Sequence, residues 1–213
     1  MHTLALAVLF TLSHSAVLAL PSISSCGGER VTAVGETHDQ AARLARNLVK
    51  NTGIGTFMSV MNADRNDGIL EGYPFGSMDY YADDCESPGT PLMLLSDLQV
   101  NVRNAKTDNR VSLAIRRLPG RNENTSPMAE PRVTLLGHLV PVAKDKYANA
   151  EACFLAQHPN VGWLPGSGFH DFKWYHLEIK DIYYIGGFGG IHYIGWIDTE
   201  TYHSKEQPQF RAQ

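Results

Sequence analysis

The chain has 213 residues, of which 43% are hydrophobic and 19% are charged, and its formal net charge is −4 at pH 7. This length suits one domain with a substantial core, whereas the negative charge balance does not supply the basic surface that nucleic-acid binding requires. Nucleic acid is therefore excluded as an expected partner.

The amino-terminal segment is apolar and uncharged, since residues 1–20 contain no Asp, Glu, Lys or Arg. Its apolar block is too short to span a membrane comfortably, which is typical of a secretory signal peptide. Val17 and Ala19 satisfy the small-residue rule for cleavage, so we expect a signal peptide over residues 1–19 and no stable membrane span after it. Because the segment lacks Lys and Arg, an uncleaved signal anchor is the alternative.

The first predicted element of the fold is an amphipathic helix. Residues 20–36 are rich in Ser and Gly without apolar periodicity, which predicts a flexible segment ahead of it. Thr37 and Gln40 then form a capping-box pair, followed by apolar residues at helical spacing and by Gly53 where a helix commonly ends.

A β-rich region follows, with strand-like segments over residues 55–61, 72–81 and 91–95. An Asn-Asp-Gly turn signal at residues 66–68 joins the first two, so the three segments predict a meander. Ser96 and Gln99 form a second capping-box pair, which predicts a short helix through Lys106.

The second half of the chain combines strands with one more helix. Strands are predicted over residues 111–115, 132–142, 172–185 and 191–197, and a helix over residues 145–158. Six or seven strands with three interspersed helices favour a barrel-like antiparallel sheet over a doubly wound one. We therefore expect one mainly β domain with α-helices (α+β) over residues 37–203 and a carboxy-terminal tail over residues 204–213.

A proline-rich segment, residues 118–131, predicts a long surface loop. It carries Asn124-Thr125-Ser126, the only Asn-x-Ser/Thr sequon of the chain. In a secreted protein such a loop is accessible to the glycosylation machinery, so Asn124 is the expected glycosylation site, and an unused sequon is the alternative.

The three cysteines are Cys26, Cys85 and Cys153. In an oxidising compartment one disulfide is possible, and we expect Cys26 to pair with Cys85 because both lie in flexible segments that permit close approach. Cys153, inside a helical pattern, would then be a buried thiol. Their spacing matches no zinc pattern.

The order of elements over about residues 38–200 resembles the flavin-binding split-barrel superfamily of the pyridoxamine-phosphate-oxidase type. The segments PLMLLSDLQ at 91–99, AQHP at 156–159 and IYYIGGFGG at 182–190 are similar to the CREG family of glycoproteins. The last segment also resembles the glycine turn of haem-utilisation proteins that share this barrel. The resemblance implies a split antiparallel β-barrel with three peripheral helices, a homodimer formed through the barrel faces, and a secreted protein or one of the vacuole or lysosome lumen.

Flavin-using members of this superfamily hold the FMN phosphate with cations where the third strand meets the following helix. In this chain Asp97 stands at that junction and would repel a phosphate. The nearest cations on the same helix, Arg103 and Lys106, are expected on the order of 10 Å along its axis.

FMN therefore remains only a possible cofactor. Its tentative binding residues are Ser96, together with free backbone amides at the helix start, and the cations Arg116 and Arg117 at the end of the next strand. A solvated strand end is the alternative for both arginines.

Other chemistries find little support in the sequence. The histidines form no i, i+4 pair, so no metal site is expected, and His192 after the glycine turn is the best single candidate for a haem ligand. No catalytic residue is named because Gly-x-Ser-x-Gly and a Cys with an adjacent base are both absent.

These observations favour a secreted or endolysosomal CREG-like glycoprotein that is non-catalytic and recognises another protein, such as a receptor. An FMN-dependent oxidoreductase is the alternative, and haem binding is a third possibility. The first is preferred because no complete catalytic set can be named.

Overall fold

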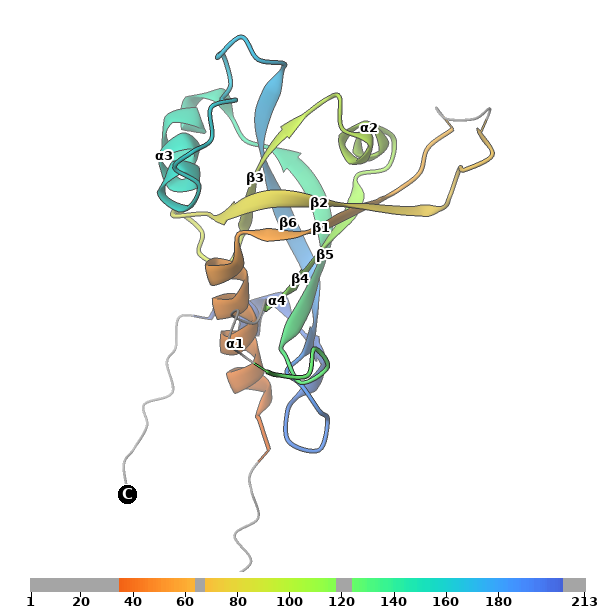
Figure 1. Cartoon of the computed structure of the whole chain (residues 1–213), viewed down its shortest axis with the longest axis vertical. Coiled ribbons are helices and arrows are strands. Elements are labelled where there is room, and N and C mark those ends of the chain that lie inside the picture. Colours follow the sequence, from red (N-terminus) through yellow and green to blue (C-terminus); the bar gives the residue numbers. More distant parts are fainter. Residues whose placement is uncertain (1–34, 64–67, 118–123, 205–213) are drawn as a thin grey trace, which may run out of the picture. The chain divides into compact units, whose positions relative to one another are not determined.

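The computed structural model describes residues 35–63, 68–117 and 124–204 (Figure 1). The expected signal peptide, most of the flexible segment after it, the Asn-Asp part of the turn signal and nearly all of the carboxy-terminal tail lie outside these residues. The helices and strands, in chain order, are α1 His38–Thr52, β1 Ile54–Val60, β2 Pro74–Asp83, β3 Pro91–Ser96, α2 Val100–Thr107, β4 Arg110–Arg116, β5 Arg132–Pro141, the 3-10 helix η2 Lys144–Lys146, α3 Tyr147–Gln157, β6 Phe172–Ile185, β7 Ile194–Ile197 and α4 Thr199–His203.

The strands form one antiparallel sheet in the order β3-β2-β1-β4-β5-β6-β7. An additional pairing of β3 with β6 closes six of these strands into a barrel, and β7 extends the sheet beyond β6. Within the described residues, the three expected α-helices are present, and α4 is an additional short α-helix. The expected α+β split barrel is therefore confirmed.

Alternation of apolar and polar residues places one face of each strand in the barrel interior. Phe57, Leu113 and Leu135 are fully buried there, on three neighbouring strands. In β3 all six residues are buried, because Met93 and Leu95 face the interior whereas Leu92 and Leu94 pack in a second apolar cluster beneath α3. This explains the uninterrupted apolar run from Pro91 to Leu95.

Helix α1 begins at the predicted capping box. The Gln40 amide N–H donates to the Thr37 hydroxyl at 3.3 Å, and the Thr37 N–H donates to the Gln40 side chain at 2.8 Å. Gly53 follows the helix with φ of 73°, a left-handed conformation that suits glycine. Arg46 donates to the carbonyl oxygens of Tyr202 and Ser204, which ties the end of the described chain to α1.

The second capping-box pair forms only one of its two expected hydrogen bonds and does not open the helix. Ser96 N–H donates to the Gln99 side chain at 2.9 Å, and Leu98 N–H donates to the Ser96 hydroxyl at 3.2 Å. Ser96 is still the last residue of β3, where it pairs with Phe172. The bonds therefore close a turn over 96–99, and α2 starts only at Val100.

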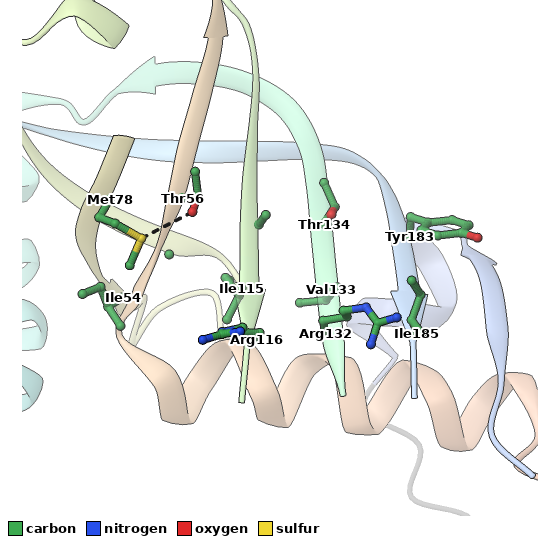
Figure 2. A pocket seen from close by; sticks show the side chains of 12 residues that line it. Ile54, Thr56, Met78, Ile115, Arg116, Arg132, Val133, Thr134, Tyr183 and Ile185 are labelled. Carbon is green, nitrogen blue, oxygen red and sulfur yellow. Dashed lines mark hydrogen bonds between the residues drawn. The ribbon is translucent and has the colours of Figure 1, made fainter. Parts of the chain in front are cut away.

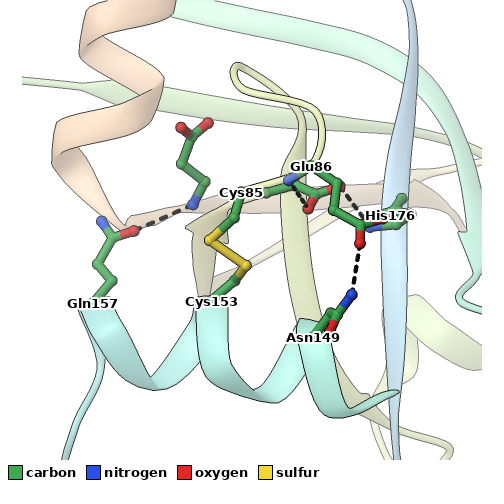
Figure 3. Close-up of a disulfide and its surroundings, with 8 residues drawn as sticks. Cys85, Glu86, Asn149, Cys153, Gln157 and His176 are labelled. Atoms are coloured by element: carbon green, nitrogen blue, oxygen red, sulfur yellow. Dashed lines mark hydrogen bonds and ion pairs between the residues drawn. A yellow bond between two sulfur atoms is a disulfide. The ribbon is translucent and has the colours of Figure 1, made fainter. Parts of the chain in front are cut away.

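The disulfide joins Cys85 to Cys153, with Cα atoms 5.8 Å apart (Figure 3). This corrects both the expected pairing of Cys26 with Cys85 and the expected free thiol at Cys153. The reason is tertiary: α3 lies beside the end of β2, where the Asp83 N–H donates to the Gln157 side chain at 3.2 Å. Packing of the helix, rather than chain flexibility, brings the two sulfur atoms together. Cys26 lies outside the described residues.

In the described part of the chain, none of the helices has the length and apolar character needed to cross a bilayer.

Candidate functional site

The principal candidate site is a groove of about 530 Å³ on the outer surface of the barrel, which we call the outer groove (Figure 2). Its lining side chains come from five neighbouring strands, β2, β1, β4, β5 and β6. They include Ile54, Thr56, Met78, Ala114, Arg116, Arg132, Thr134, Tyr183 and Ile185.

Strand register explains why the surface is hollow there. Thr56 pairs with Ala114, and Ala114 pairs with Thr134, so three small side chains lie side by side on adjacent strands. The larger Met78 and Tyr183 flank this row, because they pair with Thr56 and Thr134 respectively. Short side chains in the centre and long ones at both ends produce the depression.

Two cations stand at one end of the groove. Arg116 and Arg132 are directly paired across β4 and β5. Arg132 donates weakly to the carbonyl oxygens of Met128 and Glu130, at 3.3 and 3.4 Å. In the described ranges Arg116 has no carboxylate partner, so the pair carries uncompensated positive charge there. Guanidinium groups in this setting attract carboxylates and phosphates.

The neighbouring Arg117 faces a different part of the molecule. It forms an ion pair with the buried Glu130 at 2.6 Å, and this hydrogen bond lowers the pKa of the Glu130 carboxyl. Arg117 borders a second cavity of about 620 Å³, beside α1, which His192 and Tyr184 also line. Alternation along the chain thus separates the two arginines that the sequence grouped together.

His192 is tied to the start of the described chain. Its Nδ1 lies 3.3 Å from Glu36 Oε2, which also accepts a hydrogen bond from Tyr193 N–H at 3.0 Å. His192, the residue that the sequence singled out as a haem ligand, therefore lines the second cavity. It is not among the described residues that line the outer groove.

The junction of β3 and α2 has its own hydrogen-bond network. The Ser96 hydroxyl donates to Asp171 at 2.9 Å. Asp97 Oδ2 contacts Lys106 at 2.7 Å and Lys173 at 3.1 Å. The hydrogen bond from Lys106, followed by that from Lys173, holds the pKa of the Asp97 carboxyl below its usual value.

The expected distance from Asp97 to its nearest cation is therefore wrong. The Lys106 side chain reaches back along α2, and Lys173 approaches from β6, which sequence spacing along one helix does not reveal. Both ammonium groups already have an anionic partner and the Ser96 hydroxyl is bonded, so these residues do not fit an FMN phosphate. The structure does not bring Ser96 together with Arg116 and Arg117.

Asp79 is a buried carboxyl group that the sequence reasoning missed. It accepts hydrogen bonds from its neighbour Tyr80 N–H at 2.9 Å and from the Gln99 side chain at 2.7 Å. Burial nevertheless raises the pKa of Asp79 to about 6. Alternation could not have revealed it, because its neighbours Met78 and Tyr80 are apolar yet exposed, so the pattern of β2 predicts Asp79 on the outer face.

Among the described residues, no three His, Cys, Asp or Glu side chains are grouped so that they could hold a metal ion.

Comparison with known proteins gives one family and a small set of relatives. The family model described as "CREG, beta-barrel" matches residues 36–204. The non-canonical heme oxygenase HOZ, chloroplastic, of Arabidopsis thaliana is 33% identical over 117 residues, which cover 55% of this chain and 33% of that protein. Protein CREG1 of Gallus gallus is 23% identical over 165 residues, which cover 72% of this chain and 81% of that protein. The chain thus spans a third of the Arabidopsis relative.

Solved structures share the barrel. A heme binding protein from Mycobacterium smegmatis superposes with a TM-score of 0.59 at 26% identity, over 76% of this chain and 60% of that one. The protein Atu2129 from Agrobacterium tumefaciens, of unknown function, has a TM-score of 0.59 at 20% identity, over 82% of this chain and 64% of that one. The second similarity concerns the fold alone.

Proposed function

Because the chain belongs to the CREG beta-barrel family, we propose that it is a secreted or endolysosomal glycoprotein that acts by binding another protein through the outer face of its barrel. The observation that carries this proposal is the exposure of large apolar side chains around the outer groove. Met78 is 63% exposed, Trp196 is 54% exposed and Ile194 is 46% exposed. Apolar surface gathered on one sheet face is typical of interaction sites.

A second copy of the chain is the first partner that we propose. The outward row of side chains continues from the groove onto β7, where Trp196 pairs with Tyr183 and their rings lie 5.0 Å apart. An apolar face can pack against the same face of a second copy across a twofold axis, which is the usual symmetry of a homodimer. A receptor would be an alternative occupant of the same face.

Light scattering of the full chain at micromolar concentration tests the dimer. Wild-type protein should give about twice the chain mass, and Trp196→Glu should give the monomer mass, because a charge would be buried in the interface. Phe169→Glu is the matched control, since Phe169 is similarly exposed at 56% but lies in the loop before β6. A monomeric wild-type chain, or equal effects of both variants, would contradict the homodimer.

Two features support a lumenal compartment. The disulfide between Cys85 and Cys153 is of the kind that persists in oxidising compartments. Asn124 is exposed, as a glycosylated residue must be. Expression in a secreting eukaryotic host should yield protein in the medium that starts at Leu20. Its mass should fall after enzymatic removal of N-glycans, whereas Asn124→Gln should remove that change.

Haem binding is the second candidate function. Its specific support is the pair Arg116 and Arg132 at the end of an apolar groove, since arginines suit the two carboxylates of a haem. Two relatives are themselves a heme oxygenase and a heme binding protein. Tyr183 and Met78 in the groove are of residue types that can serve as axial ligands to iron.

Titration of the full chain with hemin tests this candidate. Binding should produce an absorption band at about 400 nm, and a variant with both Arg116→Ala and Arg132→Ala should lose affinity by about tenfold or more. Arg110→Ala removes a cation from the other end of β4 and should leave the titration unchanged. An unchanged titration in the double variant would exclude the groove as the haem site.

A further inference from the structure

Asp97 is the centre of an ion cluster that the proposed function does not use. It follows β3 directly, Lys106 comes from the last turn of α2, and Lys173 comes from the start of β6. Both ammonium groups contact the same oxygen, Asp97 Oδ2, so they must lie close to each other. The other oxygen, Oδ1, is buried and accepts no hydrogen bond from the described residues.

We propose that Asp97 is a built-in counter-ion, whose carboxylate occupies an anion site formed by Lys106 and Lys173 and thereby excludes phosphate-bearing ligands from it. Two ammonium groups that converge on one oxygen are the arrangement that would hold a phosphate oxygen. In this chain the oxygen belongs to the protein itself. This inference does not depend on the proposed function of the outer face.

The surroundings indicate which ligand the two lysines would otherwise take. Lys106 and Tyr175 line a cavity of about 420 Å³ whose other walls include Val102, Leu139 and Pro141. Lys173 and Tyr175 are two residues apart on β6, so their side chains leave the strand on the same face. A phosphate on the lysines could therefore be joined to a small apolar or ring-shaped group beside Tyr175.

Electrostatic contacts agree with this compact arrangement. Burial, and after it the negative charge of Asp97, raises the pKa of the Tyr175 phenol. The hydrogen bond to Asp97 raises the pKa of Lys173, so its ammonium group stays charged. A second carboxylate, Asp171, lies 3.8 Å from Lys173 but is held by the Ser96 hydroxyl. Asp171 therefore contacts Lys173 at the edge of the cluster but does not bridge Lys173 and Lys106.

Charge removal at Asp97 tests the inference, because Asp97→Asn keeps the shape of the side chain. The probes are FMN and riboflavin, which differ only by the phosphate, titrated by flavin fluorescence against the full chain. Wild-type protein should bind both equally weakly. Asp97→Asn should bind FMN at least about tenfold more tightly than riboflavin, and adding Lys173→Met should abolish that preference.

Asp171→Asn is the matched control, since it removes a nearby negative charge without opening the bridge, and it should behave as wild type. A wild-type preference for FMN of about tenfold or more would overturn the inference. Equal behaviour of Asp97→Asn and Asp171→Asn would also overturn it.

If Asp97→Asn does not fold, the double variant Lys106→Met and Lys173→Met tests the inference by removing the two cations in place of the carboxylate. The inference requires that this double variant show the same difference between FMN and riboflavin affinity as wild type. In wild type both lysines are already paired with Asp97 and cannot hold a ligand phosphate. A loss of FMN binding with riboflavin binding unchanged would show that the lysines serve an external phosphate, which is the opposite conclusion.

Discussion

Arg116 lies directly opposite Arg132 in the antiparallel pairing of β4 with β5, at one end of the outer groove (Figure 2). Like charges in this cross-strand position oppose each other and reduce stability. The anion-binding role proposed for this pair would account for its retention, because site residues are commonly kept at some expense of stability.

Replacing Arg116 by Thr should therefore stabilise the fold by a few tenths of a kcal/mol, since it removes the like-charge contact from an exposed strand end. Urea denaturation measures the change. Arg110→Thr is the control on the same strand, because Arg110 is held by Asp108 through a hydrogen bond of 2.8 Å and its removal should not stabilise. A loss of stability in Arg116→Thr as large as that in Arg110→Thr would contradict this interpretation.

The Cys85–Cys153 disulfide closes a chain segment with a sequence separation of 68 residues. In the chain-entropy account, a loop of this length adds about 4 kcal/mol to the free energy of unfolding. Cys153→Ser should therefore lower stability by up to about that amount, and a reducing agent should have the same effect on wild-type protein. Cys26→Ser should change little. A large loss in Cys26→Ser with none in Cys153→Ser would restore the pairing expected from the sequence.

Asp79 should make the chain more stable in mild acid. Burial raises its pKa from 3.8 to about 6 in the folded state. The free energy of unfolding is therefore highest below about pH 4, where Asp79 is protonated in both the folded and the unfolded chain. This stability is lost as the pH rises through about 6, where folded Asp79 becomes charged. At neutral pH the buried charge then opposes folding by roughly 2 to 3 kcal/mol.

Asp79→Asn should remove this pH dependence and raise stability at pH 7, because the amide stays neutral and can still accept the Tyr80 N–H bond. Unfolding curves at about pH 4 and pH 7 measure the difference. Asp108→Asn is the opposite control, since hydrogen bonds from Arg110 lower the pKa of Asp108 to about 2. Loss of the Asp108 carboxylate should destabilise the chain at pH 7. Equal pH profiles for wild type and Asp79→Asn would contradict the assignment.

The strands and helices could be predicted because their signals are local. Alternation places Phe57 and Leu113 inside whatever sheet they join, and the Thr37–Gln40 capping box is contained within four residues. Closure of the barrel is not local, since it pairs Leu92 with His176. It became predictable only through the resemblance to a known barrel.

The candidate site was harder to predict, because it depends on which residues meet across strands. Alternation separates Arg116 from Arg117, and strand register then supplies Arg132 as the neighbour of Arg116. Lys173 reaches Asp97 only because β6 pairs with β3, where Lys173 is opposite Leu95. Residue type and spacing along the chain do not predict these contacts between residues on different strands.

The outer groove should be closed by one substitution at its centre. Ala114 points outward between Thr56 and Thr134, so Ala114→Phe would place a ring in the middle of this row of small side chains and leave the barrel interior untouched. The fold should remain stable, since an outward aromatic residue is favoured on a strand. Haem affinity should fall by at least about tenfold, because the ring occupies the volume of the ligand.

Ser112→Phe is the matched control, since Ser112 is on the same outward face of β4, two residues away, and does not line the outer groove. It should leave hemin titration unchanged. Light scattering on both variants separates the two proposed uses of this face, because a filled groove blocks a ligand but still offers apolar surface to a second copy. Loss of hemin binding with an intact dimer in Ala114→Phe, and neither loss in Ser112→Phe, is the expected pattern. Equal hemin binding by the two variants would remove the outer groove as a haem site.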